Sequence, residues 1–203
     1  MHISEGVLSA PVLISGGVLA AAGTAVGLKK MDYDQIARVG ILSASFFVAS
    51  LIHVPIGPSS IHLIMNGIVG LLLGWTAFPA IMVALLLQGL FFQYGGITTL
   101  GVNTVIMAVP AVVCYFCFAP LIWKKGAVGF LAAFGAGFGA VFLGAIIVGL
   151  ALVFTEQNFF EVASLVVISH IPVMIIEGIV CVFCVTFLKK VHPAMLPHHS
   201  QNG

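Results

Sequence analysis

Long runs of apolar residues, separated by a few charged ones, constrain this chain more than any other feature of its sequence. The 203 residues are 61% hydrophobic and only 6% charged, and their mean hydropathy of +1.23 lies outside the range of soluble domains. We therefore expect an all-α, polytopic integral membrane protein that forms a single transmembrane domain over residues 1–203. Cutting the runs at charges, prolines and glycine clusters predicts seven transmembrane helices, at 10–28, 36–52, 62–75, 77–92, 101–123, 127–153 and 163–188.

The few cationic residues predict how the chain is oriented in a membrane. Seven spans put the two termini on opposite sides, and this arrangement places every Lys and Arg on one face. Since cytoplasmic loops are enriched in Lys and Arg, we expect the amino terminus outside and the carboxyl terminus inside. The cationic residues are Lys29, Lys30, Arg38, Lys124, Lys125, Lys189 and Lys190.

Charge and motifs exclude two kinds of activity. The net charge is +1, so the chain has no basic surface for nucleic acid. The phosphate-binding pattern Gly-x-x-x-x-Gly-Lys-Ser/Thr is absent from the sequence. The chain therefore cannot hydrolyse ATP by that route, and an ATP-driven process would need partner proteins.

The first two residues, Met1 and His2, are a candidate metal chelate. The terminal amine, the His2 amide and the His2 imidazole can close a five-membered and a six-membered ring around one ion. Such a planar nitrogen field suits Ni(II), Cu(II) and, less well, cobalt. A histidine in second position is also common without any metal role, so the dipeptide alone is a weak signal.

Two expectations strengthen the chelate hypothesis. Methionine aminopeptidases remove Met only before small residues, so His2 should keep Met1 in place. We also see no basic region and small-residue cleavage site of a signal peptide before the first apolar run. Ser9, followed by Ala10 and Pro11, predicts a helix start, and the leader before it could reach roughly 25 Å into the bundle. Glu5 is expected to place an acid near a helix start rather than to bind metal.

A planar metal site needs a fourth nitrogen ligand besides these three. We predict that it comes from the segment between the second and third helices. His62 is expected at the start of the third helix, where it would share a face with Asn66. Asn66, Ser59 and Ser60 are candidates to hydrogen-bond the imidazole and fix its orientation. His53 is the competing ligand, and an ordinary interfacial role is the default for either histidine.

Residues 93–104 form a second polar segment on the predicted outer side. The segment is rich in glycine and ends with Asn103 and Thr104. Irregular backbone is tolerated at membrane depth where protein or a water-filled cavity surrounds it. The segment is therefore a candidate wall or lid of the metal pocket, and an ordinary tight connection is an equally good explanation.

The last predicted helix carries two ionisable residues on one face, His170 and Glu177. Intramembrane ionisable residues are usually paired and functional. We expect interhelical locking or contact with a partner subunit rather than transport chemistry. Two Cys-x-x-Cys pairs, 114–117 and 181–184, resemble a zinc site, but in apolar helices their thiols are expected to act as small hydrophobic groups.

Four segments together resemble the CbiM/NikM family, the substrate-capture membrane subunits of energy-coupling-factor (ECF) transporters for cobalt and nickel. They are residues 1–6 (MHISEG), 57–62 (GPSSIH), 95–104 (GGITTLGVNT) and 170–178 (HIPVMIIEG). The resemblance implies seven helices, a prokaryotic cell membrane and metal ligation by Met1, His2 and His62. Tyr94 departs from the pattern, because many cobalt-type members carry histidine there, so nickel and cobalt both stay open.

The resemblance also implies partners. It predicts uptake of Ni(II) or Co(II) as a transported ion, with no permanently bound cofactor and no enzymatic activity in this chain. The energy would come from separate ATP-binding cassette ATPases through a transmembrane coupling subunit, with a small accessory membrane subunit as a further partner. The domain would then be a transmembrane metal-binding unit.

Two alternatives from other classes remain. The first is a membrane enzyme in which His53, His62 and His170 hold haem or a catalytic metal. Against it, the chain has no His-Glu-x-x-His motif. The second is a stand-alone secondary metal transporter, a class that usually shows internal repeats, and we find none.

Overall fold

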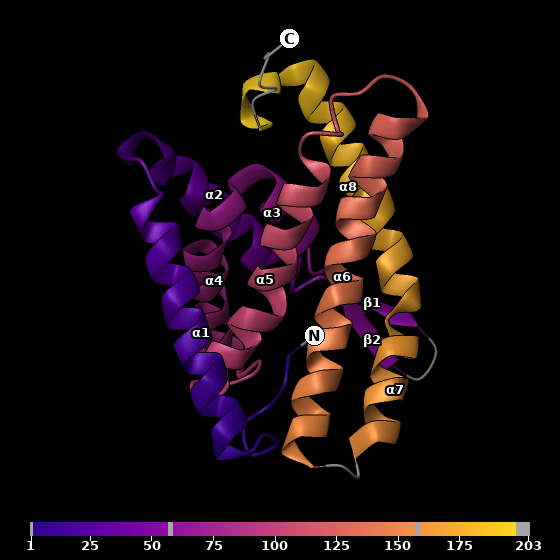
Figure 1. The fold of residues 1–203 in the computed structure, drawn as a ribbon. Helices are drawn as coiled ribbons and strands as arrows, with labels where there is room; N and C mark the ends of the chain where they lie inside the picture. The colour runs from indigo at the N-terminus through magenta and orange to yellow at the C-terminus, as the bar shows by residue number, and fades with distance from the viewer. Residues whose placement is uncertain (1, 57–58, 157–158, 198–203) are drawn as a thin grey trace.

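The computed structural model describes residues 2–56, 59–156 and 159–197, without the side chains of 53–56 and 59–62. Helices pack side by side into one bundle (Figure 1). The α-helices are α1 (Ala10–Lys29), α2 (Ile36–Ala49), α3 (Asn66–Leu73), α4 (Ala77–Phe92), α5 (Leu100–Phe118), α6 (Ala127–Thr155), α7 (Phe160–Ser169) and α8 (Ile171–Val191). Short 3-10 turns are η1 (Tyr33–Gln35), η2 (Gly74–Thr76) and η4 (Pro193–Met195), and the strands are β1 (His53–Ile56) and β2 (Ser59–His62).

Each of the seven predicted helical regions contains a helix in the structure. Within the described part of the chain, five stretches are long and apolar enough to cross a membrane. They are α1, α3 with α4, α5, α6, and α7 with α8. The helix α2, with 14 residues, is shorter than a typical span. The chain is thus a helical membrane protein, and the count of seven crossings stays a prediction.

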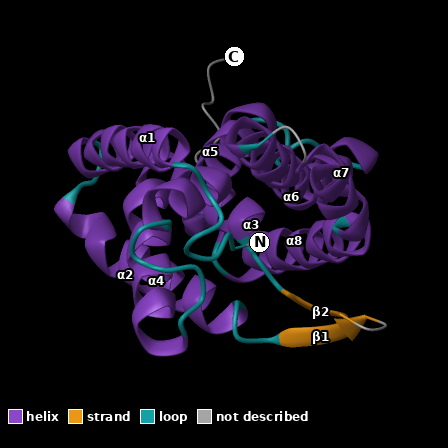
Figure 2. Cartoon of the chain, turned by 90° about the horizontal axis from the view of Figure 1, so that it is seen from below, coloured by secondary structure: helices purple, strands orange, loops and turns teal. Residues whose placement is uncertain are grey.

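The prediction that the third helix starts at His62 is wrong. Residues 59–62 instead form β2, which pairs with β1 in an antiparallel hairpin beside the bundle (Figure 2). The helix α3 begins only at Asn66, after Met65 takes a left-handed conformation with φ of 54°. Because His62 lies in a strand, it does not share a helix face with Asn66. The hairpin pairs the Cα positions of His53 and His62, so both candidate ligands lie at its base.

Prolines account for two further differences from the predicted helices. The helix α5 ends at Phe118 rather than 123, and Pro120, which follows closely, lacks the amide hydrogen that would continue the helical ladder. The last predicted helix is divided at His170 into α7 and α8. Pro172 lacks the amide hydrogen that would bond to Ile168, so the helical ladder is interrupted there.

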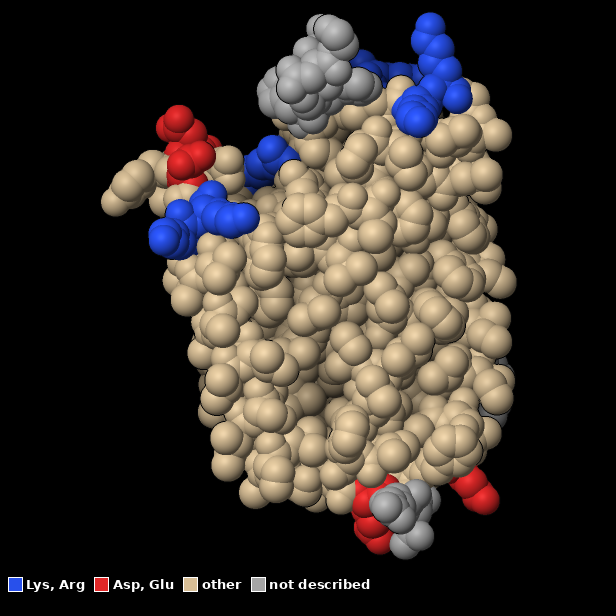
Figure 3. Space-filling model, viewed as in Figure 1, with Lys and Arg blue, Asp and Glu red and all other residues tan. Residues whose placement is uncertain are grey.

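Lys and Arg gather at one end of the molecule (Figure 3). This end, called the basic end below, includes the last turns of α1 and α8, which carry Lys29, Lys189 and Lys190. Residues 2–9, called the leader below, lie in the opposite half of the bundle (Figure 1). The separation agrees with the positive-inside pattern, and which end faces the cytoplasm stays a prediction.

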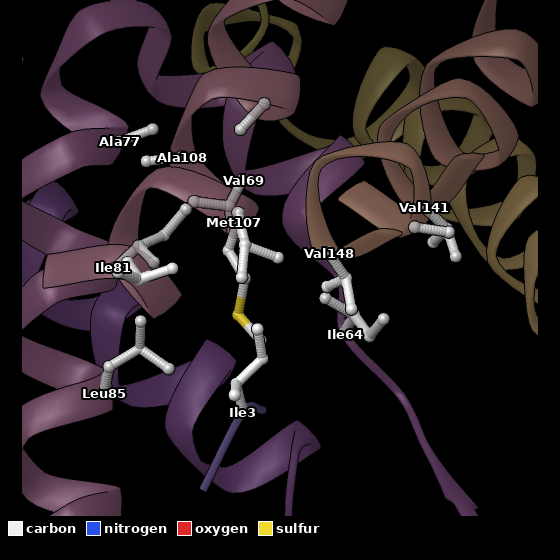
Figure 4. Packing of buried hydrophobic residues seen from close by; sticks show 14 of the residues in the cluster. Ile3, Ile64, Val69, Ala77, Ile81, Leu85, Met107, Ala108, Val141 and Val148 are labelled. Atoms are coloured by element: carbon white, nitrogen blue, oxygen red, sulfur yellow. The ribbon is translucent and has the colours of Figure 1, made fainter. Parts of the chain in front are cut away.

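The core is built from small and aliphatic side chains of α3, α4, α5, α6 and α8. Ile3 of the leader belongs to it, together with Leu85 and Met107 (Figure 4). On α1 the ridge containing Gly16 faces inward, where a side chain at that position would collide with Val102 of α5. Ile3 and Leu8 therefore anchor the leader in the hydrophobic core, whereas residues 4–7 between them are exposed.

The cysteines form no disulfide: all four are free. Cys114 and Cys181 are buried between helices, and Cys117 is exposed. These positions fit the expectation that the thiols pack as small apolar groups.

Candidate metal centre

The leader runs from the amino-terminal end of α1 back into the centre of the bundle (Figures 1 and 2). Asn103 of α5 holds it there through two hydrogen bonds to one residue. The Ile3 amide donates to Asn103 Oδ1 at 2.9 Å, and Asn103 Nδ2 donates to the Ile3 carbonyl at 3.0 Å. Asn103 Nδ2 also donates to Thr99 Oγ1 at 3.2 Å, which fixes the amide plane. Both backbone polar groups of the buried residue Ile3 are thus satisfied by one side chain.

Glu5 fastens the leader to the glycine-rich segment that precedes α5. Its Oε1 accepts hydrogen bonds from the Thr98 amide and the Thr98 hydroxyl, both at 3.0 Å. These hydrogen bonds lower the pKa of Glu5, which is otherwise exposed to solvent. Glu5 therefore does place an acid near a helix start, but the helix is α5 rather than α1.

The glycine pair 95–96 makes room for the leader. Both residues have positive φ, 80° at Gly95 and 146° at Gly96, which favours glycine. A side chain at Gly96 would occupy the space of the Glu5 side chain, and one at Gly95 would lie 2.7 Å from Asn103 Nδ2. Residues 93–104 thus form a wall against which the leader packs.

His2 ends a chain of polar side chains that runs through the bundle. Its Nε2 lies 2.7 Å from Gln88 Oε1 of α4. Gln88 is fully buried, and its Nε2 donates to Ser50 Oγ at 2.7 Å. Ser50, the residue after α2, donates in turn to the Phe47 carbonyl at 2.7 Å. The imidazole is therefore held from one side by α4 and the end of α2.

Burial lowers the pKa of His2 to about 3. The positive amino terminus lowers it further, and the hydrogen bond with Gln88 raises it in part. The imidazole is therefore neutral at physiological pH, which is the form that binds metal ions.

Several other predicted site residues either lie outside the described part of the chain or make a local hydrogen bond. Met1 lies outside the described residues, as do the side chains of Ser59, Ser60 and His62. Thr104 is buried but bonds only to the Leu100 carbonyl of its own helix. Within the described residues, no group of three or more His, Cys, Asp or Glu side chains comes together to hold a metal ion.

Asn66 stands at the start of α3 and is almost completely buried, at 1% exposure. Its Nδ2 donates to the Met107 carbonyl at 3.3 Å. Its Oδ1 is buried and has no hydrogen-bond partner among the described residues. A buried acceptor without a donor is costly, so we expect its donor among groups outside the described residues.

Glu177 of α8 fixes the segment that joins the hairpin to α3. Its Oε1 accepts hydrogen bonds from the amides of Ile64 and Met65, the latter at 2.9 Å, and its side chain is 2% exposed. His170 makes only local contacts, with its Nδ1 2.7 Å from the Val166 carbonyl. Of the two, Glu177 therefore performs the interhelical locking that was expected.

Sequence reasoning missed Gln88 and Ser50 as parts of this region. Gln88 carried the clearest signal, because it is the one strongly polar residue in the apolar stretch 77–92. Ser50 gave no signal, since serine at a helix end is common.

Comparison with known proteins identifies the family. A family model described as the cobalt uptake substrate-specific transmembrane region, CbiM, matches residues 2–195. The chain belongs to the CbiM family. A putative metal transport protein from Haemophilus influenzae is 41% identical over 199 residues, covering 97% of both chains. Like other CbiM members, the chain is therefore a multi-pass cell-membrane protein of cobalt and nickel uptake, and its relatives are transport components rather than enzymes.

Two further comparisons extend this assignment within the CbiM family. A fused nickel transport protein, NikMN, from Rhodobacter capsulatus is 38% identical over 115 residues, which cover 54% of this chain and 33% of that protein. A crystal structure of a truncated transition metal transporter superimposes with a TM-score of 0.79 at 25% identity, over 95% of this chain and 100% of that one. The CbiM fold described above is thus the fold of a transition metal transporter.

Proposed function

We propose that this CbiM protein captures Ni(II) or Co(II) from the outer side of the membrane as the substrate-specific subunit of an ECF-type importer. The proposed ligands are the Met1 amine, the His2 amide and imidazole, and the His62 imidazole. The observation that carries the proposal is the docking of the leader: Ile3 is buried and bonded to Asn103, and His2 is held by Gln88 in the centre of the bundle. A leader that only connected solvent to α1 would not need these contacts.

The hairpin supports His62 as the fourth ligand. Glu177 fixes the backbone two and three residues after His62, so the base of the hairpin is tied to α8. Asn66 Oδ1 is a buried acceptor without a described partner, and we propose that it receives the N–H of the metal-bound imidazole. Ser59 and Ser60 are proposed as further polar groups near this ligand.

The metal is cargo rather than a resident cofactor, and uptake requires other subunits. The proposed partners are a transmembrane coupling subunit, ATP-binding cassette ATPases and a small accessory membrane subunit. The existence of a fused nickel transport protein among the relatives supports association with other transport segments. ATP hydrolysis by this chain has no support in its sequence.

Calorimetry with Ni(II) and Co(II) tests the capture site. The purified chain should begin at Met1, which intact mass spectrometry verifies before titration. One alanine added before Met1 should abolish tight binding, because the amine would no longer close the five-membered ring. His62→Ala should weaken binding strongly, and His53→Ala serves as its matched control at the paired hairpin position. Equal affinity of the native and extended chains would refute the chelate.

Uptake measurements test the need for partners. Cells that express this chain alone should accumulate no more radioactive nickel or cobalt than cells without it, and co-expression of the coupling subunit and ATPases should restore uptake. Uptake by the chain alone would instead support a secondary transporter. Labelling of single cysteines placed in the leader and in the tail tests the proposed orientation.

A further inference from the structure

The chain of hydrogen bonds from Phe47 to His2 has a direction that its first member determines. A backbone carbonyl only accepts hydrogen bonds, so the single hydroxyl hydrogen of Ser50 must point toward the Phe47 carbonyl. Phe47 is among the last four residues of α2, whose carbonyls have no helical partner. The Ser50 hydroxyl therefore satisfies a group that needs a donor.

The direction of the hydrogen bond between Gln88 and Ser50 follows from that of the Ser50–Phe47 bond. With its hydrogen directed at Phe47, Ser50 Oγ can only accept along the line to Gln88. The Gln88 amide nitrogen donates to it at 2.7 Å, and this turns Gln88 Oε1 toward His2. Gln88 is 0% exposed, so water does not offer its amide an alternative arrangement.

The last bond then determines where His2 carries its proton. Gln88 Oε1 is an acceptor, so the neutral imidazole must donate from Nε2. The lone pair is consequently on Nδ1. From the His2 amide nitrogen, Nδ1 closes a six-membered chelate ring, and Nε2 would require a larger and strained one.

We infer that Gln88 and Ser50 are positioning residues that set the His2 tautomer, with Nε2 protonated and the Nδ1 lone pair presented to the transported metal ion. The inference rests on the proposed Met1–His2 chelate and deepens it. Neither residue touches the metal. Their effect is to orient a ligand before the ion arrives, as outer hydrogen-bond partners do in other metal sites.

Nuclear magnetic resonance of the metal-free protein tests the tautomer directly. Long-range proton–nitrogen spectra of the full chain labelled with 15N-histidine should show one imidazole protonated at Nε2 and not at Nδ1. This signal should disappear in His2→Ala, which assigns it. A His2 protonated at Nδ1, or at both nitrogens near neutral pH, would overturn the inference.

Variants separate positioning from stability. Gln88→Leu should give a mixture of tautomers and weaken Ni(II) binding by about 10–100-fold, the usual effect of losing such a partner. Gln88→Glu retains an acceptor facing Nε2 and should recover the tautomer and most of the affinity. Ser50→Ala should change the tautomer mixture and the Ni(II) affinity in the same direction as Gln88→Leu, to a smaller extent.

Ser43→Ala is the matched control. Ser43 is also a buried serine of α2 that bonds to α4, through the Ala80 carbonyl at 2.7 Å, but it is not connected to His2. It should leave tautomer and affinity unchanged. An equal loss of affinity in Ser43→Ala and Ser50→Ala, or an unchanged tautomer and affinity in Gln88→Leu, would overturn the inference.

The outcomes also separate this inference from the proposed function. If alanine added before Met1 leaves Ni(II) affinity intact, the chelate is wrong even where the tautomer is as expected. If that extension abolishes binding but Nε2 is unprotonated in the native chain, the chelate stands and the positioning role of Gln88 and Ser50 fails.

Discussion

Asn103 hydrogen-bonds both backbone groups of Ile3, accepting from its N–H at 2.9 Å and donating to its carbonyl at 3.0 Å. The two residues are 100 positions apart in the chain, and both are buried. This pair determines where the first residues of the protein lie relative to α5, and therefore where any ligand that they supply is presented.

Asn103→Ala should release the leader. The change leaves the N–H and carbonyl of Ile3 without partners, each a loss of about 1–3 kcal/mol for a buried group. We expect the bundle to remain folded and Ni(II) affinity to fall by more than tenfold, measured by calorimetry. Asn103→Asp keeps the acceptor and should have an intermediate effect. Thr104→Val, which removes a hydroxyl bonded only within α5, is the control.

Gly96→Ala should weaken metal binding without unfolding the bundle. The new methyl group would collide with the Glu5 side chain, and alanine is strained at a φ of 146°. Gly40→Ala on α2 meets no atom within 4 Å and should leave affinity unchanged. Equal affinities for the two variants would show that the leader does not need this contact.

Glu5 makes the attachment of the leader dependent on pH. Its hydrogen bonds with Thr98 hold the pKa of Glu5 below its usual value. A lowered acid pKa means that the contribution is complete above the ordinary value of 4.5 and is lost as pH falls through the lowered value. Glu5→Gln should therefore bind metal more weakly than the native chain near pH 7.

The difference in leader attachment between the native chain and Glu5→Gln should shrink as the pH falls and the Glu5 carboxylate is protonated. Because metal binding itself weakens in acid, leader attachment is better followed by a fluorophore than by affinity. A probe on a cysteine introduced at Ser4, in a background where exposed Cys117 is replaced by serine, reports its release. A difference that stays constant however far the pH is lowered below 4.5 would contradict the role of the Glu5 carboxylate.

Glu177→Ala should destabilise the whole bundle. Two buried amides, of Ile64 and Met65, would lose their acceptor, and we expect a loss of about 2–5 kcal/mol in the free energy of unfolding. Glu177→Gln keeps a carbonyl oxygen at this position and should cost much less. Thermal unfolding in detergent measures both.

His170→Ala is the comparison for Glu177→Ala, because among the described residues the His170 side chain bonds locally, to Val166 and Ser169 of α7, and its loss should have a small effect. A His170→Ala variant as unstable as Glu177→Ala would mean that both residues, rather than Glu177 alone, tie α8 to the bundle.

The helices could be predicted from the sequence because apolar runs in a membrane leave the backbone no alternative to internal hydrogen bonding. The hairpin could not. Its strands are four residues long and contain Pro55, and a short apolar segment of this kind reads equally well as a loop or as the first turn of a helix. What decides the start of α3 is Glu177, more than 100 residues away in sequence.

The site was predictable only where chemistry is local. Met1 and His2 are adjacent, so their chelate could be proposed from sequence alone. The position of the leader in the bundle depends on its hydrogen bonds with Asn103 and Gln88. These bonds can form only after α4 and α5 have packed together, so the sequence does not reveal them. Asn103 was expected near the pocket because of its segment, whereas its two bonds to Ile3 depend on tertiary structure.

The burial of Ile3 has a consequence for biogenesis. The leader is synthesised first, yet the side chains that receive it, Gln88 and Asn103, are made roughly ninety to a hundred residues later. The leader therefore cannot dock until α4 and α5 have been made. Its docking thus depends on helices that are made later, and a bulky group attached to the leader would have to fit among the side chains that surround Ile3.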